Sequence, residues 1–585
     1  MEPDTPQKEP PLFDDLLELP PEEAADRLAK AIHAPPAEGV ESFEGDAAAV
    51  NLVADRRVGD PILDHIPLSA IETLVDRCLK SLEDGVPGSR QTTWRLLDVL
   101  RRSTLMCRIV EVGAVDDWSK RILNLVESSH FTFAALFKQR AQGYGERVLF
   151  RVPTNGTYRS ISWRQAAGRV DLIARGLRAL TAETGDRPFA ILSNNCLEMA
   201  LVDLACLTSG IVNIMVPATA SETDVAFILE HANVGGILVS DLEQFQKVHR
   251  VRDRLPNLGP IVALDQSLAG ARGVITFEQL LTRSSEISTD ALAERRTAQQ
   301  IEDLATVMYT SGTTGTPKGI CFTHRNIVFK RFARALALPE IGEEDRFLSY
   351  LPLFHTFGRF LEMTGCVFWG ATYCFARNPG IENLVREMRS LEATVFISIP
   401  MKWMQLYDLV RQNVDVVAAE DEEIETAVRE TVGSGLRWGL SAAGYLDPEI
   451  FRFFQRHGIE LMSGFGMTEA TGGITMTPPG GYKEDSLGPA LPGVEIAVAK
   501  DGELKIRGPY VTSGLLDPPE GKQPFDADGW FPTGDLMEQD EDGFVRIVDR
   551  KKEIYKNING QTIAPQKIEN LFRDFDSVAR IFLVG

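Results

Sequence analysis

YTSGTTGTPKG, residues Tyr309 to Gly319, sets five small hydroxyl side chains and three glycines around a single lysine, Lys318. Glycines allow the backbone to approach an anion and to point N–H groups at it, and the hydroxyls and the lysine supply further donors. The preceding run, LATVMY, predicts a buried strand, and nucleotide sites favour strand ends. The spacing differs from that of the GxxxxGK[ST] phosphate loop. A flexible surface loop would share this composition but not the ordered pattern, so we predict a phosphate-binding loop of another class.

The composition indicates a globular protein with several domains. The chain of 585 residues exceeds the roughly 250–300 residues at which a single core stops growing. A net charge of −22 argues against nonspecific binding to nucleic acid or to an anionic membrane surface. The seven cysteines are scattered and lack CxxC spacing, which predicts reduced thiols in a cytoplasmic protein and no cysteine metal site.

Neither the N-terminus nor the most apolar window has the pattern of a membrane signal. The first residues, MEPDTPQKEPPLFDD, are acidic and proline-rich, unlike a signal peptide, and residues 1–20 are predicted to be disordered. The window LVDLACLTSGIVNIMVPA is interrupted by Asp203, Gly210 and Asn213. It predicts a helix that runs into a strand within a core, not a membrane span.

The order of predicted elements indicates an α/β protein. Helices are predicted at Ser69–Leu82, Gln91–Val110 and Val115–Val126, within an N-terminal helical extension of residues 1–129. From residue 130 apolar strands alternate with helices, which predicts layered α/β subdomains. These strand runs are RPFAILSNN, GIVNIMVP, VGGILVSD, GPIVALD, FLSYLPL, ATYCFA, TVFISIP, LRWGLSAA and IELMSGFG. A small β-rich subdomain follows GELKIRG and ends at residue 548, and the acidic run Glu420–Glu425 is expected on a solvated helix face.

Five further segments follow the Tyr309 loop in a recognisable order. They are YLPLFHTFGR (Tyr350–Arg359), SAAG (Ser441–Gly444), FGMTE (Phe465–Glu469), FPTGDL (Phe531–Leu536) and DRKKEIYKNINGQTIAPQKIE (Asp549–Glu569). Together with YTSGTTGTPKG they resemble the signatures of the acyl-adenylate-forming (AMP-binding) superfamily over residues 130–585. The last segment, with APQKIE after a glycine, is most similar to the long-chain fatty acid–CoA ligases.

The resemblance implies a role for each matching residue. ATP would contact Thr310, Ser311, Gly312, Thr313, Thr314, Gly315, Ser441, Ala442, Ala443, Gly444, Phe465, Gly466, Asp535 and Arg550; Gly560 would line the pantetheine tunnel of coenzyme A; Lys318, Thr468, Glu469 and His355 would be catalytic; Mg²⁺ would be held by Glu469 and Thr310. Within this set, Phe465 would stack on adenine, Asp535 would accept hydrogen bonds from the ribose, and His355 would border the acyl pocket. Most members carry tyrosine in place of Phe465, and a buried core histidine is the alternative for His355.

The implied reaction explains why these residue types are needed. A carboxylate has no good leaving group, so displacement of pyrophosphate from ATP first gives an acyl-adenylate, which a thiolate can attack. An anion then approaches an anionic phosphate, and loop N–H groups, Lys318 and Mg²⁺ must neutralise the charge. We therefore expect a fatty acid, ATP and CoA as ligands, no nucleic acid, and peripheral membrane contact only because of the substrate.

The C-terminal part departs from the family pattern. An adenylation domain of residues 130–548 is followed by a hinge at 549–553, with Glu553 at the rotation point, and by an incomplete lid at 554–585. The 33 residues from 553 onward fall below the roughly 40 that usually fold unaided, and no lysine follows Lys567. Two other functions stay open: an acyl-AMP ligase or carboxylate-reductase-type module that loads a carrier protein, and a catalytically impaired binding or scaffold protein.

Overall fold

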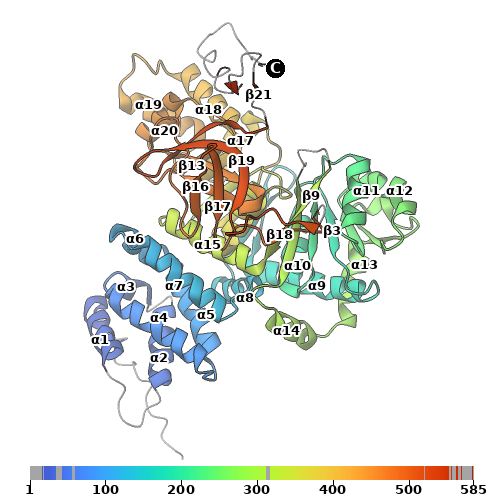
Figure 1. Cartoon of the computed structure of the whole chain (residues 1–585), viewed down its shortest axis with the longest axis horizontal. Coiled ribbons are helices and arrows are strands. Elements are labelled where there is room, and N and C mark those ends of the chain that lie inside the picture. The colour runs from blue at the N-terminus through green and yellow to red at the C-terminus, as the bar shows by residue number, and fades with distance from the viewer. Residues whose placement is uncertain are drawn as a thin grey trace, which may run out of the picture.

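The computed structural model describes residues 16, 19–34, 42–55, 59–310, 316–518 and 521–552, and beyond these only 555–556, 562–563, 565, 568 and 583. Within these residues the chain forms two eight-stranded sheets, a four-stranded sheet and a group of N-terminal helices (Figure 1). The predicted class, layered α/β subdomains with a small β-rich part, is confirmed. Among the described residues, no helix is both long enough and apolar enough to cross a membrane.

The described part of the N-terminal region, residues 1–129, contains seven α-helices. They are α1 (Pro21–His33), α2 (Ser42–Ala54), α3 (Gly59–Leu63), α4 (Leu68–Glu83), α5 (Ser89–Leu100), α6 (Ser103–Glu111) and α7 (Val115–Ser128). The helices predicted at 69–82 and 115–126 are confirmed, whereas 91–110 is two helices and not one. The chain breaks there because Arg102 is extended and its guanidinium donates to the carbonyls of Val53 at 3.2 Å and Ala54 at 2.7 Å. The predicted disorder of residues 1–20 falls mostly outside the described residues.

One large sheet has the strand order β18-β9-β8-β4-β3-β5-β6-β7. Its strands are β3 (Phe189–Leu192), β4 (Asn213–Val216), β5 (Gly236–Val239), β6 (Ile261–Ala263), β7 (Val274–Thr276), β8 (Leu304–Thr310), β9 (Lys318–Thr323) and β18 (Gly514–Leu515). The six strands from β8 to β7 are parallel, whereas β9 and β18 run antiparallel to their neighbours. Every residue of β3, β4, β5 and β6 is buried, which explains why these strands are continuous apolar runs in the sequence.

Helices α9 (Trp163–Ala182), α10 (Leu197–Ser209), α11 (Glu222–His231), α12 (Leu242–Val251), α13 (Phe277–Thr282) and α14 (Thr289–Ala298) belong to this part of the chain. The apolar window around Asp203 forms α10 followed by β4, as predicted. Helix α10 ends at Gly210, which adopts a left-handed conformation with φ 70° that glycine tolerates best.

The other large sheet has the order β15-β14-β13-β12-β10-β11-β1-β2. Its strands are β1 (Val148–Pro153), β2 (Tyr158–Ser162), β10 (Arg346–Ser349), β11 (Thr372–Phe375), β12 (Val395–Ser398), β13 (Trp438–Ala442), β14 (Glu460–Met467) and β15 (Gly472–Met476). The associated helices are the π-helix η5 (Phe357–Met363), α16 (Thr364–Trp369), α17 (Ile381–Ser390), α18 (Pro400–Asn413), α19 (Asp421–Val432) and α20 (Pro448–Arg456). All five predicted strands of this series are confirmed, and the acidic run lies at the start of α19, where Asp421, Glu422 and Glu423 are exposed.

The β-rich subdomain is an antiparallel sheet of order β16-β17-β19-β20. Its strands are β16 (Glu495–Val498), β17 (Glu503–Arg507), β19 (Phe531–Gln539) and β20 (Val545–Arg550), and a separate short pair joins β21 (Tyr555–Lys556) to β22 (Thr562–Ile563). Figure 1 shows the four-stranded sheet next to the ends of the two large sheets. The small sheet carries Asp535, and the two large sheets carry Lys318 and Glu469. The predicted nucleotide site is therefore built from all three sheets.

Helix α15 (His324–Ala337) follows β9 and is enclosed on all sides. It lies beside α6 and α7 of the N-terminal region and α8 (Phe133–Tyr144) of the main body (Figure 1), and it also packs against α16. Every residue from Asn326 to Leu336 is buried. The N-terminal helices therefore cover the helix that follows β9, the strand at the end of the predicted phosphate loop.

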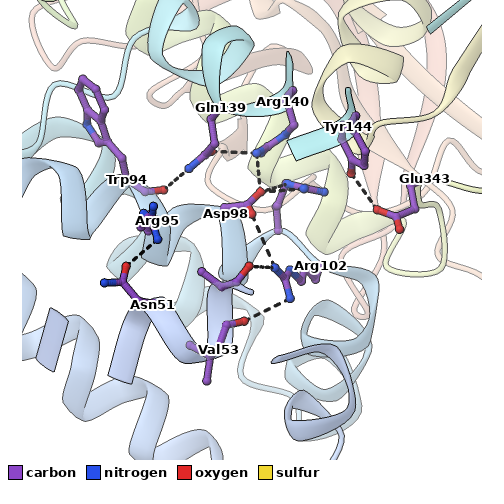
Figure 2. A network of polar contacts seen from close by, with 12 residues as sticks. Asn51, Val53, Trp94, Arg95, Asp98, Arg102, Gln139, Arg140, Tyr144 and Glu343 are labelled. Atoms are coloured by element: carbon purple, nitrogen blue, oxygen red, sulfur yellow. Dashed lines mark hydrogen bonds and ion pairs between the residues drawn. The ribbon is translucent and has the colours of Figure 1, made fainter. Parts of the chain in front are cut away.

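A buried charge network joins the N-terminal helices to α8. Asp98 of α5 accepts hydrogen bonds from Arg101 at 2.8 Å and from Arg140 of α8 at 2.5 Å, and Arg102 lies 3.7 Å away (Figure 2). The Arg140 side chain is fully buried, so its charge depends on this carboxylate for compensation. On the same helix, the hydroxyl of Tyr144 donates to Glu343 at 2.9 Å (Figure 2).

Candidate active site

Strands β8 and β9 hold the two ends of the predicted phosphate loop side by side. Thr310, the last residue of β8, is paired with Lys318, the first residue of β9. A Cβ atom at Gly319 would lie 3.1 Å from the Tyr309 ring and 3.2 Å from Cβ of Leu516, so a larger residue would fit here only if these neighbours moved slightly. Residues Ser311, Gly312, Thr313, Thr314 and Gly315, predicted to bind phosphate, lie outside the described residues.

The FGMTE segment forms the end of β14 and the turn after it. Phe465 and Gly466 belong to β14, and Thr468 and Glu469 form the short helix η6 (Thr468–Ala470) that leads into β15. A Cβ atom at Gly466 would lie 2.1 Å from the carbonyl oxygen of Gly472, so no other residue fits here without a shift of the backbone. The N–H group of Thr512 donates to the carbonyl of Glu469 at 2.6 Å, which ties this turn to the segment that pairs with β9.

Charges from three sheets act on one another around Glu469. Burial raises the pKa of the Glu469 carboxyl, the positive charge of Lys318 lowers it, and the negative charge of Asp535 raises it. Lys318 belongs to β9, Glu469 follows β14, and Asp535 belongs to β19. The structure therefore brings three of the predicted site residues into electrostatic range, although they are far apart in the sequence.

This carboxylate is suited to a magnesium ion that is shared with phosphate. Among the described residues there is no cluster of three or more His, Cys, Asp and Glu side chains that could hold a metal by itself. Mg²⁺ in enzymes that act on nucleotides is commonly bound by one or two carboxylates together with substrate phosphates. Glu469, partly buried beside Lys318 and Asp535, fits that arrangement, and Thr310 of β8 would approach from the phosphate loop.

Asp535 lies in the small sheet opposite its predicted partner Arg550. The two residues are paired across β19 and β20, and Nε of Arg550 lies 3.4 Å from the Asp535 carboxylate. The Asp535 side chain is mostly buried, whereas that of Arg550 is exposed. The backbone N–H of Asp535 donates to the hydroxyl of Thr533 at 3.2 Å, and Gly534 adopts φ 80°. The T-G-D sequence therefore fixes the carboxylate in place, while Arg550 remains accessible to a ligand.

The SAAG segment and Phe465 lie at the same edge of a parallel sheet. Ser441 and Ala442 end β13, and Ala442 is paired with Gly464, the residue before Phe465 on β14. Ala443 adopts a left-handed conformation with φ 64°, and a side chain at Gly444 would lie 3.2 Å from Pro400. Ligands of α/β sheets bind at the carboxyl ends of the strands. The buried Ser441 hydroxyl has no hydrogen-bond partner in the described structure. It is therefore available to bond a ligand.

His355 is exposed and lies between β10 and η5, next to Phe354, with ring centroids 5.0 Å apart. Desolvation by the surrounding protein lowers the pKa of its imidazole. The adjacent Thr356 packs against β15, since a Cβ atom at Gly472 would lie 3.7 Å from that of Thr356. The predicted acyl segment therefore adjoins the hairpin that carries Glu469. Gly560 and Glu553 lie outside the described residues.

Sequence reasoning missed a buried pair, Arg359 and Asp203, that fixes the His355 segment. The guanidinium of Arg359 in η5 donates to both carboxylate oxygens of Asp203 in α10, and also to Asn213 of β4 and Thr306 of β8. All four residues are buried. A charged residue inside the apolar window 201–218 was the available signal, because a buried acid requires a partner.

Comparison with known proteins gives the family. The model of the AMP-binding enzyme family matches residues 137–516. Long-chain-fatty-acid–CoA ligase FadD15 of Mycobacterium tuberculosis is 26% identical over 490 residues, covering 78% of this chain and 80% of that protein. Human long-chain-fatty-acid–CoA ligase 6 is 27% identical over 497 residues, covering 76% and 70%.

Solved structures show the same fold. ATP-bound MatB of Rhodopseudomonas palustris superposes with a TM-score of 0.63 at 21% identity, covering 77% of this chain and 85% of that one. O-succinylbenzoate coenzyme A synthetase (MenE) of Bacillus subtilis, in complex with ATP and magnesium ion, gives 0.61 at 23% identity, covering 76% and 85%. The family model matches most of the sequence, and the motifs and the fold agree with that match. This chain therefore belongs to the AMP-binding enzyme family.

Proposed function

We propose that this protein activates a fatty acid with ATP to form acyl-AMP and pyrophosphate, and then transfers the acyl group to CoA. One observation carries the proposal: the charges of Lys318 and Asp535, which come from two other sheets, act on the carboxyl group of Glu469. Relatives named long-chain-fatty-acid–CoA ligases, at 26% and 27% identity, support a fatty acid as the substrate and CoA as the acceptor.

The role proposed for each group is the one that the family resemblance implies. A carboxylate oxygen of the acid attacks the α-phosphorus of ATP, and the bond to pyrophosphate breaks. Lys318 and the loop between Thr310 and Lys318 neutralise the phosphates, and Thr468 holds the α-phosphate. Glu469, with Thr310, would hold Mg²⁺, which when bound supplies positive charge to the phosphate oxygens. Because this cluster is partly buried, each interaction is stronger than it would be in water.

The remaining residues hold the nucleotide and the acid. Asp535 accepts hydrogen bonds from the ribose, assisted by Arg550, and Phe465 and the segment Ser441–Gly444 enclose adenine. His355 borders the acyl group. In the second step the CoA thiolate attacks the acyl carbonyl and AMP leaves. By the family resemblance, Gly560 would line the pantetheine tunnel. Positioning of the reactants supplies much of the rate, so the reaction needs no nucleophilic side chain.

Mass spectrometry of the products tests the proposal. The purified protein is incubated with ATP, Mg²⁺ and a mixture of fatty acids, with and without CoA, beside the variant Asp535→Asn. We expect AMP, pyrophosphate and acyl-CoA from the parent protein and much less from the variant. Acyl-AMP that is passed only to a carrier protein would favour the carrier-loading alternative, and ATP binding without any acyl product would favour a binding protein.

A further inference from the structure

Helix α15 carries three buried cations, Lys330, Arg331 and Arg334, which we call the α15 cations. Their exposed fractions are 0%, 1% and 3%. Within the described part of the chain, no carboxylate is among the charges that act on the pKa values of these three groups. Positions 330 and 334, and likewise 331 and 334, lie on one face of a helix. Three basic side chains are therefore gathered inside the protein without a carboxylate partner among the described residues.

The hydrogen-bonding capacity of these side chains is largely unused. The Lys330 ammonium donates to the carbonyl of Gly473 and lies 3.7 Å from the centroid of the Tyr510 ring. Arg334 contacts the sulfur of Met476 at 3.4 Å, a weak acceptor, and its Nε has no partner among the described residues. Nε and Nη1 of Arg331 also have none there. Five guanidinium N–H donors per arginine normally find acceptors when they are buried.

The three groups also repel one another. Burial is the main cause that lowers the pKa of each. The charges of Arg334 and Arg331 lower the pKa of Lys330 further, and burial together with the charge of Arg334 lowers the pKa of Arg331 to about 9. The pKa of Arg334 is lowered to about 10. A buried charge without a partner destabilises a protein strongly, and apolar residues of similar volume are often more stable in such places. An anion that binds here would remove this penalty.

The α15 cations lie against the strand that joins two parts of the candidate site. A Cβ atom at Gly473 would be 1.9 Å from Nη2 of Arg334, so the glycine leaves room for the guanidinium at β15. Gly473 is paired with Gly466 of the FGMTE segment. Its neighbour Gly472 packs against Thr356, which adjoins His355. The cations are thus adjacent to the acyl segment, whereas the charges that act on Glu469 are those of Lys318 and Asp535.

We propose that the acid substrate carries a second anionic group, a carboxylate remote from the reacting one, and that the α15 cations bind it. This inference rests on the proposed function and narrows its substrate class from simple fatty acids to dicarboxylic acids. Bidentate guanidinium–carboxylate hydrogen bonds would occupy donors that have no acceptor in the described structure. A simple fatty acid places only methylene and methyl groups there, and these leave the cations without a partner.

Matched substrates test the proposal on the full chain. Monocarboxylic acids of 6, 10 and 16 carbons are compared with the α,ω-dicarboxylic acids of the same length and with their monomethyl esters, and pyrophosphate release is measured. We expect kcat/KM for the best diacid to exceed that of its monoacid and its monoester at least about tenfold, the discrimination available from one buried charged hydrogen-bond pair.

Two variants separate this site from general effects on the fold. Arg334→Met is expected to reduce kcat/KM for the diacid at least about tenfold more than it reduces kcat/KM for the monoacid, so that the preference for the diacid is lost. The control Arg325→Met removes a cation at the start of the same helix, where it pairs with Glu127, and is expected to leave the preference unchanged. If Arg334→Met fails to fold, a rise in the melting temperature of the parent protein with the diacid, and not with the monoacid, serves as the readout.

The outcomes distinguish the two proposals. Turnover of monoacids at least as fast as of diacids, with no effect of Arg334→Met, overturns the diacid inference and leaves the proposed function intact. If the diacid and the monoacid raise the melting temperature equally, the diacid inference is also overturned. The absence of adenylate or pyrophosphate with every acid, while ATP still binds, overturns both.

Discussion

Arg359 and Asp203 form a bidentate ion pair in the interior: Nε donates to one carboxylate oxygen at 2.8 Å and Nη2 to the other at 2.6 Å. Arg359 lies in η5, within the predicted acyl segment, and Asp203 lies in α10 against the other large sheet. The pair therefore links the two large sheets and fixes the backbone that carries His355, four residues before Arg359.

Asp203→Leu is expected to lower the free energy of unfolding by about 3–5 kcal/mol, because Arg359 is left charged and buried without its partner. The double variant Asp203→Leu, Arg359→Met is expected to recover most of that loss, since no buried charge remains. Urea unfolding of the parent, both single variants and the double variant measures the coupling. Additive single effects would show that the two side chains do not depend on each other.

Glu469→Gln is expected to stabilise the protein and impair its activity. Because burial raises the pKa of Glu469 in the folded state, the ionised carboxylate lowers stability above that pKa, and this cost is absent below its unfolded value near 4.5. Without nucleotide the variant should melt at a higher temperature than the parent at pH 8, and the difference should vanish near pH 4. Turnover should fall about 100-fold or more, because the amide binds Mg²⁺ poorly. A lower melting temperature with full activity would contradict the role given to this residue.

His324 is expected to make the protein less stable in mild acid. Its buried imidazole has a pKa of about 4, below the ordinary 6.5, and its Nδ1 accepts a hydrogen bond from the N–H of Phe133 at 3.4 Å. Between these two values the unfolded state binds more protons, so stability falls as the pH drops from 6.5 to 4.

Unfolding free energies of His324→Gln and of the parent, measured from pH 7 to pH 4, test this. The parent should lose up to about 3 kcal/mol relative to the variant across that window. The control His249→Gln changes an exposed histidine on α12. Parallel curves for the parent and His324→Gln would show that His324 is not the responsible group.

Asp98→Asn is expected to loosen the N-terminal helices from the main body. It removes the charge that compensates Arg101 and the fully buried Arg140, at a cost of about 3–5 kcal/mol. Glu146→Gln is a matched control, because Glu146 pairs with Arg164 at the exposed surface, where a pair is worth about 0–1 kcal/mol. Urea unfolding measures both, and equal small effects would indicate that the Asp98 network does not hold the helices in place.

The sequence predicted what depends on local pattern. Fully apolar runs such as FAIL and NIMV predicted the central strands, because parallel strands are buried on both faces. The motifs predicted Lys318, Glu469 and Asp535 as site residues, and the structure brings these three into electrostatic range of one another. The division of 91–110 into α5 and α6 depends on carbonyls of α2, which no local pattern reveals.

Contacts between residues that are distant in the sequence could not be predicted from the sequence either. Charged residues on a helix usually indicate a solvated face, and only the packing of α6, α7 and α8 around α15 shows that Lys330, Arg331 and Arg334 are buried. In the same way, Asp203 and Arg359 are 156 residues apart, so that their pairing required the tertiary structure.

The transfer of oxygen from the acid to AMP tests the adenylation step most directly. The acid that is turned over fastest is labelled with ¹⁸O in its carboxyl groups and incubated with ATP, Mg²⁺ and hydroxylamine, which traps the acyl group without CoA or a carrier. Attack of the carboxylate on the α-phosphorus predicts AMP with one ¹⁸O atom and unlabelled pyrophosphate. Unlabelled AMP, or ADP with labelled phosphate, would contradict the formation of an acyl-adenylate.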